Sequence, residues 1–245
     1  MRRISAVTFD LWDTLIQEVP GNPARVSDTR IDRIAFVLDC TGHSHAREKI
    51  EEAYDKTGTF LQLTWDKARD MPVRDHVLFL LSCVECRLPS KLAQDEFEAV
   101  VKAYADSILD YPPALLPKAK EALESVKEKG YALGLISNTG KTPGSTLRVI
   151  MDNMQILQYF DVTTFSNEIM VRKPAESAFR VTLEKLGALP RAAVHIGDDP
   201  DKDIAPAKKI GMHAIQAMSP RSKRSDIADG HAVALDDVVA IIENF

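Results

Sequence analysis

Polar side chains that can do chemistry follow three short apolar runs of the sequence, each at the point where the run ends. The triplet Ser137-Asn138-Thr139 follows one run, Asp10 follows another, and Asp198, Asp199 and Asp203 follow the third. A carboxylate can attack an electrophilic phosphorus or carbon atom and form a covalent intermediate. Hydroxyl and backbone N–H groups at the start of a helix can hold an anion. These residue types therefore point to transfer of an anionic group.

A divalent cation fits the same residues. Carboxylates at Asp10 and Asp198 would concentrate negative charge, which is unfavourable without a cation. Mg²⁺ is commonly held by one or two carboxylates, waters and substrate oxygens, and it neutralises the group being transferred. Lys173, just before Pro174, would add a positive charge beside that group. We expect a Mg²⁺ site if the fold brings these residues together.

The apolar runs are typical of buried strands, and they cover residues 4–9, 132–136, 192–196 and 212–215. Helical patterns cover about 117–130, 175–186, 204–210 and 235–242. Strands that alternate with helices predict an α/β fold, a doubly wound parallel sheet with a Rossmann-like core. Ligands of such sheets bind beyond the carboxyl ends of the strands, where the polar residues lie.

Between about Glu18 and Tyr111 this alternation stops, and four stripes of apolar residues at helical spacing replace it. Four amphipathic helices can bury their stripes against one another as a small bundle. We therefore expect an all-helical domain over residues 18–111, inserted just after the first strand. The α/β core would then consist of residues 1–17 and 112–245.

Composition excludes several classes of partner. The formal net charge of −5 supplies no basic surface for nucleic acid phosphates. No run approaches the ~20 apolar residues of a membrane span. The three cysteines, Cys40, Cys83 and Cys86, argue against a disulfide framework and fit a reducing cytosol. We expect a soluble, cytoplasmic protein with no nucleic acid or membrane partner, and the oligomeric state stays open.

Four segments resemble, in order, the motifs of the haloacid dehalogenase superfamily, and the helical insertion is similar in position to the four-helix cap of that family. The segments are Phe9-Asp10-Leu11-Trp12-Asp13-Thr14-Leu15, Leu135-Ile136-Ser137-Asn138, Arg172-Lys173-Pro174, and Ile196-Gly197-Asp198-Asp199 followed by Asp203. Four motifs in order are far more specific than any single one. The resemblance implies a hydrolase whose nucleophile is Asp10. It also implies that Asp10, Asp198 and the backbone carbonyl of Trp12 hold Mg²⁺.

The resemblance assigns the phosphoryl-binding groups as well. Ser137, Asn138 and Lys173 would bind the phosphoryl group, and Lys173 would also offset the charge of the nucleophile. Asp203 would position Lys173 or a metal-bound water. The helical cap would close over the site, exclude water and select a small phosphorylated or acidic metabolite.

One position departs from the pattern of family phosphatases, which carry a general acid–base aspartate two residues after the nucleophile. Trp12 stands there, and an indole cannot exchange a proton usefully. Asp13 is the obvious substitute, although a role in stabilising the turn is slightly favoured. Asp13 and Asp199 are kept as possible site residues. Among residues of the insertion, Arg25, Arg30, Arg33, Trp65 and Arg74 are candidates to face the site, although most are expected to be solvated or packed.

Three functions remain open from the sequence. A Mg²⁺-dependent phosphohydrolase ranks first, with good leaving groups such as acyl phosphates as favoured substrates. A 2-haloacid dehalogenase ranks second, because the aromatic residue Trp12 resembles the residue that these members of the family carry at the same position. Their fourth motif lacks the metal-binding acid that Asp198 supplies here, and their tyrosine is replaced by Phe179. A binding protein that keeps the phosphate pocket without turnover is the third.

Overall fold

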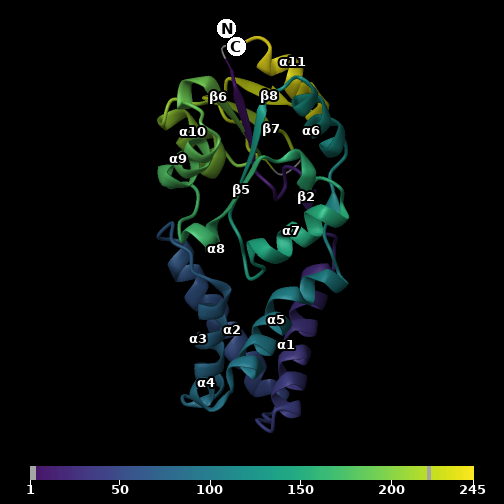
Figure 1. The fold of residues 1–245 in the computed structure, drawn as a ribbon, viewed down its shortest axis with the longest axis vertical. Coiled ribbons are helices and arrows are strands. Elements are labelled where there is room, and N and C mark those ends of the chain that lie inside the picture. The colour runs from purple at the N-terminus through teal and green to yellow at the C-terminus, as the bar shows by residue number, and fades with distance from the viewer. Residues whose placement is uncertain (1–3, 220–221) are drawn as a thin grey trace.

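The computed structural model describes residues 4–219 and 222–245, and within these ranges a six-stranded parallel sheet forms the centre of one half of the molecule (Figure 1). The strand order is β5-β4-β1-β6-β7-β8. The strands are β1 (Ala6–Phe9), β4 (Ala132–Ser137), β5 (Val162–Phe165), β6 (Ala193–Gly197), β7 (His213–Ala217) and β8 (Gly230–Ala232). β1 lies between β4 and β6. The expected α/β fold with a parallel sheet is confirmed.

Helices cover both faces of the sheet because successive side chains of each strand point to opposite faces. In β1, Ala6 joins the cluster packed under α9 and α10, whereas Val7 and Phe9 join the cluster under α6, α7 and α11. These helices are α6 (Ala119–Glu128), α7 (Gly144–Asn153), α9 (Glu176–Lys185), α10 (Ala205–Lys209) and α11 (Val238–Ile242). Shorter elements are α8 (Ser166–Ile169), the 3₁₀ turns η1 (Ser107–Asp110), η2 (Leu157–Tyr159), η3 (Pro190–Ala192) and η5 (Leu235–Asp237), and the π turn η4 (Pro200–Ile204).

The four strands expected from apolar runs are present, but β5 and β8 were not predicted. β5 reads Val-Thr-Thr-Phe and β8 reads Gly-His-Ala, so neither contains an apolar run. α7 was also missed. The helix expected over 204–210 is shorter than predicted because the π turn η4 occupies its start.

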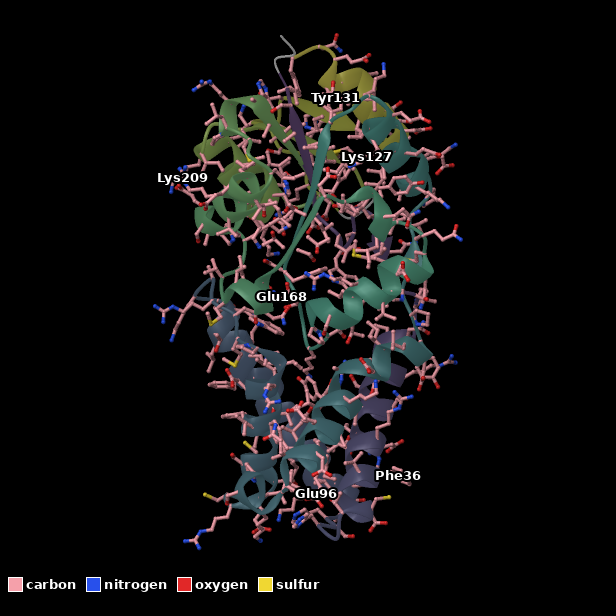
Figure 2. The ribbon with its side chains drawn as sticks, viewed as in Figure 1. Phe36, Glu96, Lys127, Tyr131, Glu168 and Lys209 are labelled. Atoms are coloured by element: carbon pink, nitrogen blue, oxygen red, sulfur yellow. The ribbon has the colours of Figure 1, made fainter. Side chains whose placement is uncertain are left out.

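The other half of the molecule is helical and has its own hydrophobic cluster, formed by residues from 31 to 104. Its helices are α1 (Asn22–Cys40), α2 (Arg47–Trp65), α3 (Val73–Val84), α4 (Leu88–Lys91) and α5 (Gln94–Asp106). In α1 the predicted stripe faces inward, with Ile31, Ile34 and Leu38 buried. Phe36, on the outer side of α1, is 69% exposed and projects away from the bundle (Figure 2). The C-terminus lies at the opposite end of the molecule from these helices (Figure 1).

A short antiparallel ribbon joins the two halves. It pairs β2 (Ile16–Gln17) with β3 (Ala114–Leu115), so the chain leaves the sheet half and returns to it on adjacent strands. An isolated bridge between Arg69 and Val171 makes a second connection. Among the described residues, no helix is long and apolar enough to cross a membrane.

Candidate active site

Three carboxylates meet at the carboxyl end of the sheet. Asp10 follows β1, Asp198 follows β6, and Asp203 lies in η4. Oxygen atoms from the three side chains lie within 4.8 Å of one another. Asp10 and Asp203 are buried, and Asp198 is half-buried. The parallel pairing of β1 with β6 causes this convergence, because it aligns the ends of the two strands.

The ammonium group of Lys173 joins two of these carboxylates. Its Nζ donates to Asp10 Oδ1 at 2.5 Å and to Asp203 Oδ1 at 2.6 Å, and the side chain is buried. Burial alone would lower the pKa of Lys173, but the charges of Asp10 and Asp203 outweigh burial and raise it. The lysine therefore stays protonated and supplies one fixed positive charge to the cluster.

One ammonium does not neutralise this cluster of carboxylates. Burial raises the pKa of Asp10 to about 7 although Lys173 opposes the shift. Burial, together with the charges of Asp203 and Asp13, raises the pKa of Asp198 to about 7. Both carboxylates thus lie where a second cation would favour their ionised forms. This set of oxygen donors fits a hard divalent cation such as Mg²⁺.

Asp203 is held by groups behind the site. With its proton on Nε2, the imidazole of His195 donates to Asp203 Oδ1 at 3.2 Å, and its Nδ1 accepts from Thr8 Oγ1 at 2.9 Å. The Asp199 N–H donates to the other carboxylate oxygen, Asp203 Oδ2, at 3.1 Å. Burial would raise the pKa of Asp203, but nearby positive and donor groups hold it well below its usual range. A Cβ at Gly197 would lie 2.4 Å from Asp203 Cγ, so this position needs glycine.

His195 and Thr8 were not identified as site residues from the sequence. The sequence did offer a clue to both residues, because each is a polar side chain in the middle of an otherwise apolar strand. Both residues are fully buried on the sheet face under α9. The ring of His195 contacts the carboxylate of Asp203, which in turn contacts Lys173.

Asn138 ties the second motif to the third. Its side-chain amide donates to the Lys173 carbonyl at 2.9 Å and accepts from the Lys173 N–H at 2.8 Å. Ser137 ends β4 with its side chain buried. The amide of Asn138 is therefore engaged in holding the lysine loop, which leaves the predicted anion contact to its backbone N–H.

The remaining predicted residues lie around the cluster. Trp12 is half-buried against the hydrophobic core, and Asp13 is exposed. Asp13 has φ 58°, a left-handed conformation, and its N–H donates to the Ile16 carbonyl at 2.7 Å. Asp199 caps η4 by accepting from the Asp201 and Lys202 N–H groups. Asp13 thus shapes a turn, and Asp199 stabilises the segment that carries Asp203.

Comparison with protein families matches residues 4–211 to the haloacid dehalogenase-like hydrolases. The chain belongs to this family. It is therefore an enzyme, a hydrolase, as the motifs indicated.

Known proteins resemble the hydrolase over nearly its whole length. It is 26% identical over 212 residues to a ribulose-1,5-bisphosphate 5-phosphatase from Halopiger xanaduensis, covering 86% of this chain and 83% of that protein. A phosphatase structure from Thermococcus onnurineus aligns with TM-score 0.62 and 24% identity, covering 98% of both chains. A 2-haloacid dehalogenase structure from Pseudomonas syringae pv. Tomato aligns with TM-score 0.68 and 21% identity, covering 98% of this chain and 99% of that chain. At these identities the two structures support the fold alone.

The two halves of the hydrolase are joined beside the site by Asp70, which lies after α2 and is buried. Its carboxylate accepts from Ser166 Oγ at 2.5 Å, Arg172 Nη1 at 2.8 Å and Thr139 Oγ1 at 3.1 Å, all in the sheet half, and from Trp65 Nε1 at 3.1 Å. Arg172 and Thr139 are the neighbours of Lys173 and Asn138. No pattern in the sequence links Asp70 to these partners in the sheet half, which lie 69 to 102 positions away.

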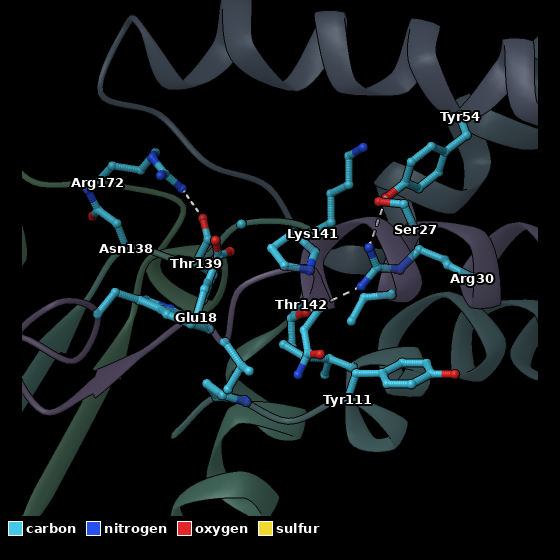
Figure 3. Close-up of a pocket in the computed structure, with 18 residues that line it drawn as sticks. Glu18, Ser27, Arg30, Tyr54, Tyr111, Asn138, Thr139, Lys141, Thr142 and Arg172 are labelled. Atoms are coloured by element: carbon cyan, nitrogen blue, oxygen red, sulfur yellow. Dashed lines mark hydrogen bonds between the residues drawn. The ribbon is translucent and has the colours of Figure 1, made fainter. Parts of the chain in front are cut away.

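A cavity of about 370 Å³ opens between the two halves (Figure 3). Trp12 and Asn138 line it on the sheet side, and Arg30 and Tyr54 line it on the helical side. Of the five candidates named from the insertion, only Arg30 lines this cavity. Two of the others contact residues that line it, Arg25 the ring of Tyr111 and Trp65 the guanidinium of Arg172. The remaining two form ion pairs away from it, Arg33 with Asp110 and Arg74 with Glu98.

Proposed function

We propose that this hydrolase is a Mg²⁺-dependent phosphohydrolase that acts on a small phosphorylated metabolite through an aspartyl-phosphate at Asp10. The observation that carries the proposal is the convergence of Asp10, Asp198 and Lys173 at one end of the sheet. The phosphatase from Halopiger xanaduensis, similar over most of the chain, supports the same reaction class.

The residues divide the work as follows. The Asp10 carboxylate attacks phosphorus, the bond from phosphorus to the leaving oxygen breaks, and water then hydrolyses the aspartyl-phosphate. Lys173, Ser137 and the backbone N–H of Asn138 hold the phosphoryl oxygens. Asp203 keeps Lys173 in place through the 2.6 Å contact.

Asp10, Asp198 and the Trp12 carbonyl are the groups that would hold Mg²⁺. When bound, Mg²⁺ supplies positive charge that offsets the anionic phosphoryl group during transfer. We also propose that residues 18–111 act as a cap, which closes the cavity over the site and excludes water.

Trp12 restricts the leaving group. General acid help is worth ~10²–10⁴-fold, and the indole of Trp12 cannot give it. Asp13 is exposed and lies in a turn, so we propose that it does not replace the missing acid. Poor alkoxide leaving groups should therefore react slowly. Acyl phosphates, whose leaving carboxylates need no proton, should be preferred.

The test compares phosphate release from acetyl phosphate, p-nitrophenyl phosphate and glycerol phosphate, each with Mg²⁺ and with EDTA. We expect metal-dependent release, fastest from acetyl phosphate and about 10²-fold slower from glycerol phosphate. Asp10→Asn should abolish it. The control is Asp201→Asn, which changes an exposed carboxylate in η4 and should retain full activity. Absence of metal-dependent release from every substrate would overturn the proposal.

Trp12 also favours a second candidate, a 2-haloacid dehalogenase, because halide leaves without a proton. Chloride release from 2-chloropropionate that is unaffected by EDTA would support it. The raised pKa of Asp198 beside Asp10 argues for a cation and so against this alternative. Phosphate binding without any turnover would instead indicate a binding protein.

A further inference from the structure

The cavity between the two halves carries more positive than negative charge on its walls. Arg30, Lys141 and Arg172 line it, and Glu18, which is exposed, is the acidic residue among the described residues that line it. Arg172 is neutralised by its ion pair with Asp70. Two cations therefore remain to be explained.

Arg30 is a buried cation that contacts only neutral groups. The residue is 3% exposed, and it donates to the Tyr104 carbonyl at 2.5 Å. It also donates to Tyr54 Oη at 3.0 Å and to Thr142 Oγ1 at 3.3 Å (Figure 3). Across residues 4–219 and 222–245, no carboxylate forms an ion pair with it. A buried charge without a partner of opposite sign is costly, so an anion in the cavity would offset this cost.

Lys141 brings a second positive charge to the same wall. It follows the second motif by three positions and reaches from the sheet half toward α2, where its Nζ lies 3.5 Å from the centroid of the Tyr54 ring (Figure 3). Lys141 likewise has no carboxylate partner in the part of the chain that the structure describes. Burial would raise the pKa of Tyr54, but the charges of Arg30 and Lys141 lower it, which indicates positive potential in the cavity.

The cavity lies beside the catalytic end of the sheet, because two of the residues that line it adjoin the catalytic residues in the chain. Trp12, two residues after the nucleophile, lines it, and so does Asn138, which holds the backbone of Lys173. Its volume suits a small metabolite. A substrate whose phosphoryl group lies at Asp10 would thus extend toward Lys141.

We propose that Lys141 and Arg30 bind a second oxyanion of the substrate, a carboxylate or a phosphate, so that the substrate class is phosphorylated acids and bisphosphates. The proposal rests on the proposed function only for the position of the phosphoryl group. A second anion held between the two halves would also favour the closed arrangement of the cavity, because Lys141 comes from one half and Arg30 from the other.

The test uses a matched pair of probes, phenyl phosphate and 4-carboxyphenyl phosphate, which differ by one carboxylate. Equilibrium binding to Asp10→Asn protein is measured by calorimetry with Mg²⁺, so that the result does not depend on turnover. We expect the carboxylated probe to bind about tenfold more tightly, the range of a charge-assisted hydrogen bond. Adding Lys141→Gln should remove most of this preference.

A control variant distinguishes the loss of a contact inside the cavity from the loss of one positive charge anywhere on the protein. Lys102→Gln makes the same change at a lysine whose side chain is 78% exposed and does not line the cavity, and it should keep the preference. Equal binding of the two probes, or a preference that Lys141→Gln leaves intact in a protein whose circular dichroism is unchanged, would overturn the subsite. Failure of wild-type protein to hydrolyse either probe, with the binding preference present, would instead count against the phosphohydrolase.

Discussion

The Nζ atom of Lys173 lies 2.5 Å from Oδ1 of Asp10, although 163 positions separate the two residues in the chain. The contact forms in the interior, where an ammonium and a carboxylate stabilise each other only if their hydrogen bonds are satisfied. The ammonium of Lys173 favours the ionised form of the buried Asp10 carboxylate, which is the form that can act as a nucleophile. The expectations below follow from this pair and its neighbours.

Replacing Lys173 by Met should damage both stability and catalysis. The change leaves Asp10 and Asp203 buried beside each other without their ammonium, and breaking a buried ion pair from one side costs about 3–5 kcal/mol. Urea unfolding measures the loss of stability, and initial rates measure the loss of activity, which we expect to exceed about 10²-fold. Lys202→Met, at an exposed lysine near the same cluster, is the control. Unchanged unfolding would contradict the charge balance described for this site.

Asp203→Asn should act mainly through the position of Lys173. The amide keeps the shape of the side chain but loses the charge that Lys173, His195 and the Asp199 N–H all contact. Loss of such an orienting partner typically costs 10–100-fold in activity, and we expect that fall mostly in kcat. Because the pKa of Lys173 also depends on this carboxylate, the basic limb of the pH–rate profile should move to lower pH. A fall in kcat with no movement of that limb would indicate a purely structural role.

The metal-free protein should lose stability as pH rises from 5.5 to 8. A carboxyl group whose pKa is raised on folding stabilises the fold below its unfolded pKa, and that contribution is lost as pH rises through the folded value, here about 7 for Asp198. His76 and His195, whose pKa values burial lowers, act in the opposite direction. The comparison is therefore between wild type and Asp198→Asn, whose melting temperature should fall less over this range.

Mg²⁺ should reverse this trend in the wild type. Because a divalent cation binds the ionised carboxylates, it should raise the melting temperature more at pH 8 than at pH 5.5. Asp198→Asn should lose most of the metal effect. An equal effect of Mg²⁺ on both proteins would mean that the cation binds elsewhere.

Trp12→Asp should restore general acid help. The rate with glycerol phosphate should rise, by up to about 10²-fold, whereas the rate with acetyl phosphate should change little because its leaving group needs no proton. Trp12→Phe removes the indole without adding a carboxyl group and is the matched control. A similar rise in the rate with glycerol phosphate in both variants would mean that removing the bulky indole, and not proton transfer, causes the effect.

Asp70→Asn should loosen the connection between the two halves beside the site. The Asp70 carboxylate accepts hydrogen bonds from both halves, and its loss leaves Arg172 without an ionic partner. We expect a higher KM and faster amide exchange in residues 139–142, measured by hydrogen exchange with mass spectrometry. Asp66→Asn, at an exposed residue on the same segment, should change neither quantity.

The sequence alone determined the class of the fold and the candidate chemistry. Apolar runs that end in Asp10, Ser137 and Asp198 are local patterns, and the rule that parallel strands align their carboxyl ends was enough to expect convergence. The helical stripe of Ile31, Ile34 and Leu38 is equally local, because side chains three and four positions apart share one face of a helix.

Only the tertiary structure decided what surrounds these groups. The contact of His195 with Asp203 depends on the π turn η4, which carries Asp203. The hydrogen bonds of Asp70 depend on how the helical half packs against the sheet half, and so does the placement of Arg30 and Lys141 in one cavity. Such contacts join positions far apart in the chain through one specific packing. No periodicity encodes them, because their free energy depends on burial and distance, which exist only once the chain has folded.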